Sequence, residues 1–323
     1  MSEEVLATRK LGKVFHVGLR RKTVIAVQDL DLSVHRGEIY GFLGPNGAGK
    51  STTIKMLIGL IFPTSGEARI FDLPIPSREA KARLGFLPEN PYFHDFLTPT
   101  ELLRFAGDLC SLTKAEKKER IPALLELVGL TRFKDVPLRR FSKGMVQRAG
   151  IAQALINDPA LVVLDEPMSG LDPIGRKDVR EIIFRLKDEG KTVFFSTHIL
   201  PDVEAICDRV GLMLGGRLRE QGRLEDLLTA RSRAVEVIAE KIPGDLAPRL
   251  QAIAVRAIPK GDGLALTFSD DGAAEDAVGA LALAGARIIQ VTPHRETLED
   301  LFMRRAEEEG VATPGGRILD KVG

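Results

Sequence analysis

The 323-residue chain has no tryptophan and only two cysteines, Cys110 and Cys207, which lie far apart and outside any Cys/His cluster. This argues against a disulfide scaffold or a zinc site and suits a reducing compartment. A strong net charge is also missing, because 46 Lys and Arg residues face 45 Asp and Glu residues, leaving +1. We therefore expect no nucleic-acid partner.

Long hydrophobic runs are likewise absent. The most apolar stretches, residues 54–62 and 277–286, fall short of the ~18–20 residues that span a bilayer. The first residues, MSEEVLATRKLGK, lack the apolar core of a signal peptide. We therefore expect a cytoplasmic protein that reaches a membrane only through a partner.

The residues that are present predict a globular α/β protein, with 44% hydrophobic and 28% charged residues. Buried strands alternate with helical patterns, which predicts a parallel sheet, over residues 37–43, 50–61, 161–164, 179–189 and 192–196. A mostly antiparallel sheet is expected before this core, over residues 4–33, and a helical insert within it, over about residues 90–158.

The pattern changes near residue 231. Three strand-like segments separated by helical stretches follow, and a last helix over residues 296–309 places Leu298, Leu301 and Phe302 on one face. We expect residues 1–230 to form a large α/β domain, residues 231–310 a small α+β domain, and residues 311–323 a flexible tail.

A glycine-rich segment follows the strand at residues 37–43: Gly44-Pro45-Asn46-Gly47-Ala48-Gly49-Lys50-Ser51. It matches the P-loop pattern G-x-x-x-x-G-K-[ST] and stands between a strand and a helix, as that motif requires. We predict that these residues and Thr52 bind ATP, with Lys50 at the β- and γ-phosphates and Ser51 on Mg²⁺. A glycine-rich turn without a ligand is the simpler alternative, which the strand–loop–helix context disfavours.

Two adjacent carboxylates, Asp165 and Glu166, end the apolar strand at residues 161–164. Downstream of a P-loop, this arrangement is typical of a Walker B segment. Asp165 is predicted to hold Mg²⁺, and Glu166 to orient and deprotonate the attacking water. Solvated acids at a strand end are the plain alternative.

Three further segments stand in a fixed order around Asp165. The segment FSKGMVQR, residues 141–148, precedes it, and Ser169-Gly170-Leu171-Asp172 and Ser196-Thr197-His198 follow it. This ordered set resembles the ABC-type ATPase family, and the resemblance covers about residues 5–230. It implies a P-loop NTPase fold with a RecA-like parallel core, and an ATP site that is shared between two cassettes.

The resemblance also implies individual roles. The signature Ser142, Lys143, Gly144 and Met145 would cap the γ-phosphate on the opposite subunit's P-loop, although Ser142 read alone is simply a helix N-cap. The D-loop, residues 169–172, would couple the two sites. His198 would contact the γ-phosphate, and Phe15 would stack on the adenine, although a lone phenylalanine is usually a core residue.

Two positions depart from the family's usual pattern. Glu89 stands where Gln is usual; it can still ligand Mg²⁺ or its water, but it cannot donate a hydrogen bond as Gln can. Lys143 stands where Gly is usual, and would either bring a cation near the trans phosphate or point to solvent. Both departures and the small C-terminal domain resemble the cassettes of type-two ABC exporters.

Lys50, Glu166 and His198 are the predicted catalytic groups, and their presence disfavours a non-catalytic regulatory subunit. We expect an ATPase that dimerises with a second cassette, an identical copy or a related one, around two Mg-ATP molecules. It would drive a separate integral-membrane permease at the inner face of the cell membrane, through an apolar contact near residues 89–96.

The alternative is a soluble ABC ATPase that acts on ribosomes or DNA. It predicts two cassettes in one chain or a long coiled-coil insertion, whereas the P-loop occurs once and no heptad run is present. A third interpretation, a GTPase or a small-molecule kinase, predicts a guanine-reading N-K-x-D or a substrate lid, and no N-K-x-D occurs. The transported substrate is not encoded, because membrane segments would recognise it.

Overall fold

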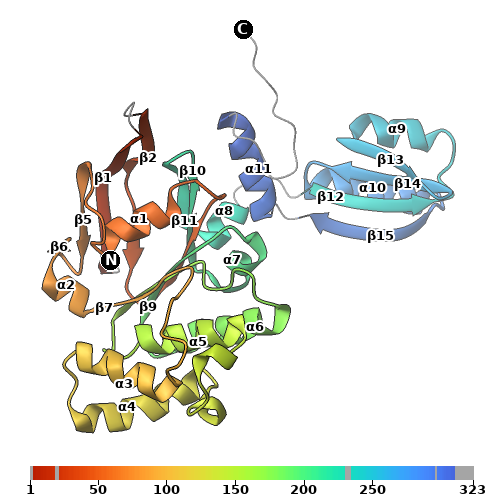
Figure 1. The fold of residues 1–323 in the computed structure, drawn as a ribbon. Helices are drawn as coiled ribbons and strands as arrows, with labels where there is room; N and C mark the ends of the chain where they lie inside the picture. Colours follow the sequence, from red (N-terminus) through yellow and green to blue (C-terminus); the bar gives the residue numbers. More distant parts are fainter. Residues whose placement is uncertain (1–2, 19–21, 230–233, 295–296, 310–323) are drawn as a thin grey trace. The chain divides into compact units, whose positions relative to one another are not determined.

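The computed structural model describes residues 3–18, 22–229, 234–294 and 297–309. The chain divides into two compact units, residues 1–223 and 224–323 (Figure 1). This division falls slightly before the expected boundary at residue 230, and the expected tail, residues 311–323, lies outside the described residues.

The first unit is built on a six-stranded sheet in the order β11-β10-β4-β9-β8-β7. Its strands are parallel except β11. Their bounds are β4 Ile39–Leu43, β7 Leu84–Leu87, β8 Leu161–Asp165, β9 Thr192–Thr197, β10 Arg209–Leu214 and β11 Arg217–Arg223. Every residue of β4, β8 and β9 is buried. A strand covered on both faces does not alternate polar and apolar residues, which is why the central residues of these strands are apolar.

Alternate side chains of this sheet face two different cores. Val162, Leu164 and Phe195 pack into a core shared with the helices α5 and α6, whereas Val163 and Phe194 pack into the core that contains Ile54 and Leu57 of α1. The rings of Tyr40 and Phe194 stack with centroids 5.6 Å apart in the second core. The sheet is thus fixed from both sides, and its strand ends are held rigidly.

Helices follow three of the sheet strands. They are α1 Lys50–Leu57 after β4, α6 Pro173–Asp188 after β8 and α7 Leu200–Ile206 after β9. Helix α1 ends earlier than predicted, because Gly59 takes a left-handed backbone conformation with φ +67°. Helix α6 begins earlier than predicted, because Asp172 caps it and Pro173 occupies its first position.

A predominantly antiparallel sheet covers one side of this unit. Its strands are β1 Glu4–Val17, β2 Lys22–Leu30, β3 Ser33–His35, β5 Ser65–Ile70 and β6 Leu73–Pro74, in the order β2-β1-β5-β6 with β3 paired to β1. The short helix α2, Arg78–Ala82, leads from β6 to β7.

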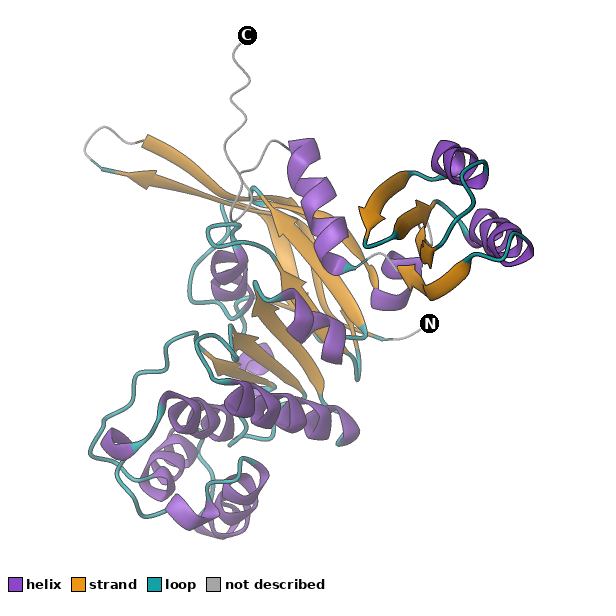
Figure 2. Ribbon diagram, turned by 90° about the vertical axis from the view of Figure 1, so that its right-hand side faces the viewer, coloured by secondary structure: helices purple, strands orange, loops and turns teal. Residues whose placement is uncertain are grey.

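The helical insert contains α3 Pro99–Leu109, α4 Lys114–Leu127 and α5 Lys143–Ala154, with two short 3-10 turns at Thr131–Phe133 and Leu138–Arg140. Thr98 and Thr113 begin α3 and α4 with complete capping boxes. The views in Figures 1 and 2 both place these helices together at one end of the unit, beyond the sheet.

The second unit has a four-stranded antiparallel sheet in the order β13-β14-β12-β15. The succession β12-α9-β13-β14-α10-β15 with this order is that of a ferredoxin-like fold. The bounds are α8 Leu224–Thr229, β12 Ala234–Glu240, α9 Leu246–Ile253, β13 Arg256–Lys260, β14 Gly263–Phe268, α10 Asp271–Leu283, β15 Arg287–His294 and α11 Leu298–Glu309. The small α+β architecture is as expected, but the strand β13 was not predicted.

Candidate nucleotide site

The loop between β4 and α1 requires glycine at two positions. A side chain at Gly44 would place its Cβ 2.4 Å from the carbonyl oxygen of Met213, and one at Gly49 would place it 2.4 Å from that of Ala26. Gly49 also has φ +105°, which side-chain-bearing residues rarely adopt. The backbone of the predicted P-loop therefore packs directly against the backbone at Met213 and Ala26, which side chains at these two positions would prevent.

Helix α1 begins without a capping side chain and has no acidic residue in its first turn. By contrast, α3, α4, α5, α6 and α10 each begin with a side chain that accepts a hydrogen bond from the first turn, from Thr98, Thr113, Ser142, Asp172 and Asp270. The first N–H groups of a helix have no acceptor within the helix itself. At α1 they are left to an external anion, which fits the phosphates of ATP.

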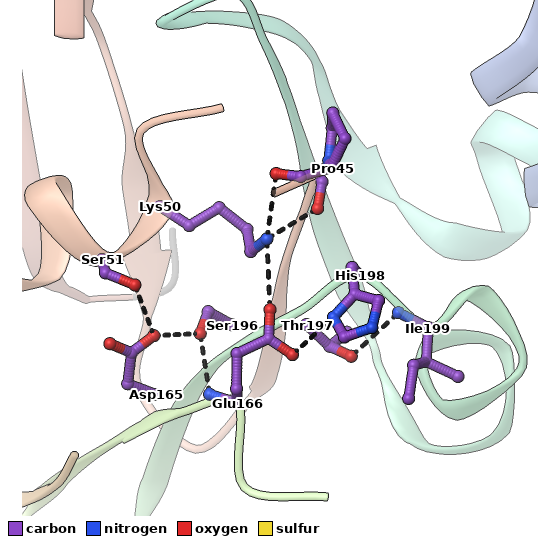
Figure 3. Close-up of polar contacts among 10 residues, drawn as sticks. Pro45, Lys50, Ser51, Asp165, Glu166, Ser196, Thr197, His198 and Ile199 are labelled. Atoms are coloured by element: carbon purple, nitrogen blue, oxygen red, sulfur yellow. Dashed lines mark hydrogen bonds and ion pairs between the residues drawn. The ribbon is translucent and has the colours of Figure 1, made fainter. Parts of the chain in front are cut away.

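Lys50, the first residue of α1, is buried together with Glu166. Its Nζ donates to the carbonyl oxygens of Gly44 at 2.6 Å and Pro45 at 3.3 Å, and lies 3.1 Å from Glu166 Oε1 (Figure 3). Only 5% of the Lys50 side chain and 6% of the Glu166 side chain are exposed. The loop carbonyls and the carboxylate together compensate a cation that has been removed from water.

Asp165 is held by two hydroxyl groups. Ser51 Oγ donates to Asp165 Oδ1 at 3.2 Å, and Ser196 Oγ donates to the same oxygen at 2.6 Å. Ser51 and Asp165, both predicted magnesium ligands, are thus adjacent. A hydroxyl and a carboxylate are the hard oxygen donors that Mg²⁺ prefers, so the pair fits that ion.

Glu89, the third predicted magnesium ligand, lies two residues beyond β7 and is exposed. Because β7 pairs with β8 in parallel, Glu89 leaves the sheet at the same edge as Asp165. Among the described residues, it makes no hydrogen bond or ion pair with Ser51 or Asp165.

Ser196 is a site residue that sequence reasoning missed. Besides donating to Asp165, its Oγ accepts a hydrogen bond from the Glu166 N–H at 2.9 Å. The signal was its position directly before Thr197-His198, at the end of a buried strand. Ser196 is opposite Asp165 in the β8–β9 pairing, so this register determines its role.

The two carboxylate oxygens of Glu166 contact two different side chains. Its Oε1 faces Lys50, and its Oε2 lies 2.9 Å from His198 Nδ1. The backbone of Glu166 is left-handed with φ +49°, a strained conformation that costs on the order of 1–3 kcal/mol in a non-glycine residue and is found mainly at functional sites. The structure therefore brings the three predicted catalytic groups, Lys50, Glu166 and His198, into direct contact.

The predicted signature lies at the start of α5. Ser142 is exposed and caps this helix, accepting from the Met145 N–H at 3.3 Å. The Lys143 Nζ lies over Gly170, only 2.4 Å from where a Cβ would stand on that glycine, and Gly144 faces Leu171. The signature and the D-loop of one chain thus pack against each other, and the side chain of Lys143 covers the D-loop glycine.

The D-loop connects Glu166 to α6. Ser169 N–H donates to the Glu166 carbonyl oxygen at 3.1 Å, and Asp172 accepts from the Gly175 N–H at 2.7 Å as the N-cap of α6. Arg176 Nε donates to the Leu171 carbonyl oxygen at 3.2 Å. A movement of the D-loop would therefore be transmitted directly to the backbone at Glu166.

Asp202, on α7 four residues after His198, is a buried carboxylate that the sequence did not indicate. Its Oδ1 lies 3.6 Å from Arg180. Burial raises the pKa of the Asp202 carboxyl, and the positive charges of Arg176, Arg180 and His198 oppose this shift. Asp202 therefore belongs to the electrostatic surroundings of His198.

Phe15, the predicted adenine-stacking residue, lies on β1 opposite Val24 of β2. Its side chain is 36% exposed, and Lys13 Nζ lies 5.1 Å from the ring centroid. Phe15 is thus a surface aromatic ring and not a core residue, and Lys13 lies over one of its faces.

Comparison with known proteins places this site in a family. Residues 27–169 match the ABC transporter family model. An uncharacterized ABC transporter ATP-binding protein of Synechocystis sp. is 43% identical over 312 residues, which cover 96% of this chain and 86% of that protein. The Nod factor export ATP-binding protein I of Cupriavidus pinatubonensis is 35% identical over 309 residues, covering 94% and 91%.

A solved structure, an ATP binding subunit of an ABC transporter, aligns with a TM-score of 0.61 at 33% identity, covering 69% of this chain and 91% of that one. The fold and the site therefore define an ATP-binding cassette. The chain belongs to the ABC transporter ATP-binding protein family, whose members hydrolyse ATP, and it is an ATPase. No helix among the described residues has the length and apolar character needed to cross a bilayer.

Proposed function

We propose that this chain is the ATP-hydrolysing subunit of an exporter, in which two cassettes close around two Mg-ATP molecules and drive a separate membrane permease from its cytoplasmic side. One observation supports this proposal above all: Glu166 contacts both Lys50 and His198, next to the start of α1, which has no capping side chain. It provides a phosphate cradle, a cation and a carboxylate base within one buried cluster.

The roles follow from the positions of the groups. Glu166 is the base that accepts the proton of the attacking water at a carboxylate oxygen, and Lys50 and His198 hold that carboxylate in place. Mg²⁺ held by Ser51 and Asp165 would neutralise charge on the phosphate oxygens. Ser196 fixes both acids, since it bonds the Asp165 side chain and the Glu166 backbone.

The proposed dimer is argued from the N-terminus of α5, which Ser142 caps. Helix α5 packs against α3, α4, α6 and β7, whereas α1 packs against β2 and β8. The exposed Ser142 cap is thus held on a different part of the unit from the cradle, which suits a group that completes the site of a second cassette. Closure would then depend on the γ-phosphate bridging the two, and hydrolysis would remove the bridge.

The proposed permease contact lies beside the helical insert. A cavity of about 340 Å³ is lined by residues 86–88 and 91–94 together with residues of α3 and α5 such as Leu102, Phe105 and Gly150. Tyr92 is 93% exposed and Phe105 is 53% exposed beside it. An apolar groove of this size suits a short permease helix. Export is proposed because the Cupriavidus relative is named for export.

The dimer can be tested with Glu166→Gln, which keeps the shape of the side chain but removes the base. In Mg-ATP this variant should elute at about twice the 35.3 kDa mass of the chain in light-scattering chromatography. Its turnover should fall by about 10²–10⁴-fold. Glu79→Gln, a change at an exposed helix position, is the matched control and should do neither. Wild-type turnover in Glu166→Gln, or no dimer even with a permease present, would contradict the proposal.

The permease contact needs a separate measurement. Tyr92→Ala should leave basal ATPase activity unchanged but lower the stimulation of that activity by permease-containing proteoliposomes. Leu60→Ala removes another exposed apolar side chain, 63% exposed, and should preserve the stimulation. Full stimulation of Tyr92→Ala would remove this surface from the proposal and leave the ATPase assignment intact.

A further inference from the structure

A groove between α3 and α4 has no role in the site described above. Its cavity of about 550 Å³ lies within the range of small-ligand pockets. One face of each helix lines it: Thr100, Arg104 and Asp108 from α3, and Lys114, Lys117, Lys118, Ile121 and Pro122 from α4. The groove therefore combines four cations with one carboxylate above an apolar floor.

The positive charges of this groove are only partly neutralised by protein groups. Lys117 pairs with Asp108, the one carboxylate that lines the groove. Lys114 and Lys118 form no ion pair with any described residue. Elsewhere in the same unit, cations such as Arg209 and Lys191 do face carboxylates, Glu38 and Asp158.

The three lysines at the start of α4 also destabilise this helix. Lys114, Lys117 and Lys118 lie within the first five residues of the helix, where the macrodipole repels cations. Lys114 and Lys118 are four residues apart, so their like charges repel each other as well. An anion seated between them would relieve both repulsions.

The size and chemistry of the groove limit the class of anion. A phosphate monoester carries close to two negative charges at neutral pH and three acceptor oxygens, which match two unpaired lysines and the fork of Arg104. Ile121 and Pro122 also line the groove, and their apolar side chains suit an apolar group on the ligand.

We propose that the α3–α4 groove is a second binding site, for a phosphate-bearing ligand with an apolar portion. The phosphate lies at Lys114, Lys118 and Arg104, and the apolar portion packs on Ile121 and Pro122. A phospholipid headgroup and a soluble phosphate ester share this chemistry. The proposal rests on the groove itself and does not depend on transport.

The test compares Lys114→Gln/Lys118→Gln with wild type in the full chain. Glutamine is a good helix former, so the change removes two charges without breaking α4. Arg78→Gln/Lys177→Gln is the matched control, because it removes two exposed charges from other helices of the same unit. Basal ATPase activity should be unchanged in both variants and reports correct folding.

Two probes distinguish the sources of the phosphate. One is co-sedimentation with phosphatidylcholine vesicles with and without phosphatidic acid, and the other is titration with phenyl phosphate. Binding to either probe should weaken about tenfold, roughly 1.4 kcal/mol, in the groove variant and stay within about twofold in the control. Binding of a probe at the P-loop would be the same in the wild type, the groove variant and the control variant, so it does not affect the comparison.

Each result decides the proposal. Loss confined to the vesicle arm supports a phospholipid ligand, and loss confined to phenyl phosphate supports a soluble ester. Absence of binding to both probes in the wild type would overturn the proposal. Equal loss in both double variants would do so too, since it would show attraction by general surface charge alone.

Discussion

The two units of this chain differ in the polar side chains that their interiors contain. Every polar or charged side chain that is buried among the described residues lies in the first unit, and Lys50, Asp165, Glu166, Ser196 and Thr197 gather at the strand ends of the candidate site. The core of the second unit is apolar, with Val237, Leu266 and Phe268 at its centre. Both units pack helices on a sheet, so buried charge is not a consequence of the architecture. It is found where the chemistry of ATP hydrolysis requires it.

The largest expected effect comes from breaking the buried ion pair in the first unit. Lys50→Ala leaves the Glu166 carboxylate buried without its cation, which should destabilise the protein by about 3–5 kcal/mol. ATP turnover should fall at least about 100-fold, because the cradle loses its phosphate-facing charge. Urea unfolding and a steady-state ATPase assay measure the two effects separately.

The double variant Lys50→Met/Glu166→Gln is the control for that experiment. It removes both charges and replaces Lys50 with an apolar side chain of similar length, so much of the lost stability should return while turnover stays low. Unchanged stability in Lys50→Ala would show that His198, and not the ion pair with Lys50, holds the Glu166 carboxylate.

The second unit should respond to a change in packing alone. Phe268 is fully buried in its apolar core, and Phe268→Ala should destabilise that unit by about 3 kcal/mol. Both tyrosines of the chain, Tyr40 and Tyr92, lie in the first unit. Tyrosine fluorescence therefore follows only the first unit during urea unfolding, whereas circular dichroism follows both.

The expected outcome is a separation of the two unfolding curves. In Phe268→Ala the dichroism signal should acquire an earlier transition, while the fluorescence midpoint and the ATPase activity stay at their wild-type values. Leu283→Ala, at a position that is 93% exposed, should change neither curve by more than about 0.5 kcal/mol. A fluorescence midpoint that shifts with the dichroism signal would mean that the units unfold together.

The sequence predicted the elements that are defined by local patterns. The apolar run at residues 161–164 and the segment at residues 192–196, with two phenylalanines at its centre, correspond to β8 and β9, because strands covered on both faces carry no polar alternation. The glycine pattern of residues 44–51 predicted the cradle, because the loop geometry tolerates no Cβ at Gly44 or Gly49. These features are properties of short segments.

What the sequence did not predict depends on tertiary register. The role of Ser196 follows from its pairing with Asp165 across two strands that lie far apart in the chain. The position of Lys143 over Gly170 depends in the same way on how α5 meets the D-loop. The strand β13 was missed because all five of its residues are exposed, so Arg256–Lys260 carries no alternating pattern.

The smallest expected effect concerns the sign of a pH dependence within the first unit. Burial raises the pKa of Asp202 above its ordinary value of 3.8, so ionisation of this group opposes folding at neutral pH. Asp202→Asn should therefore be more stable than wild type at neutral pH, and the gain should disappear as the pH falls through the raised pKa toward 3.8.

Asp158 is the opposite case, because its hydrogen bond with Lys191 lowers its pKa. Asp158→Asn should lose stability at neutral pH, and that loss should disappear only as the pH falls below 3.8 through the lowered pKa. Chemical unfolding from pH 3 to pH 8 compares the two variants, and pH profiles of the same sign would show that burial does not control Asp202.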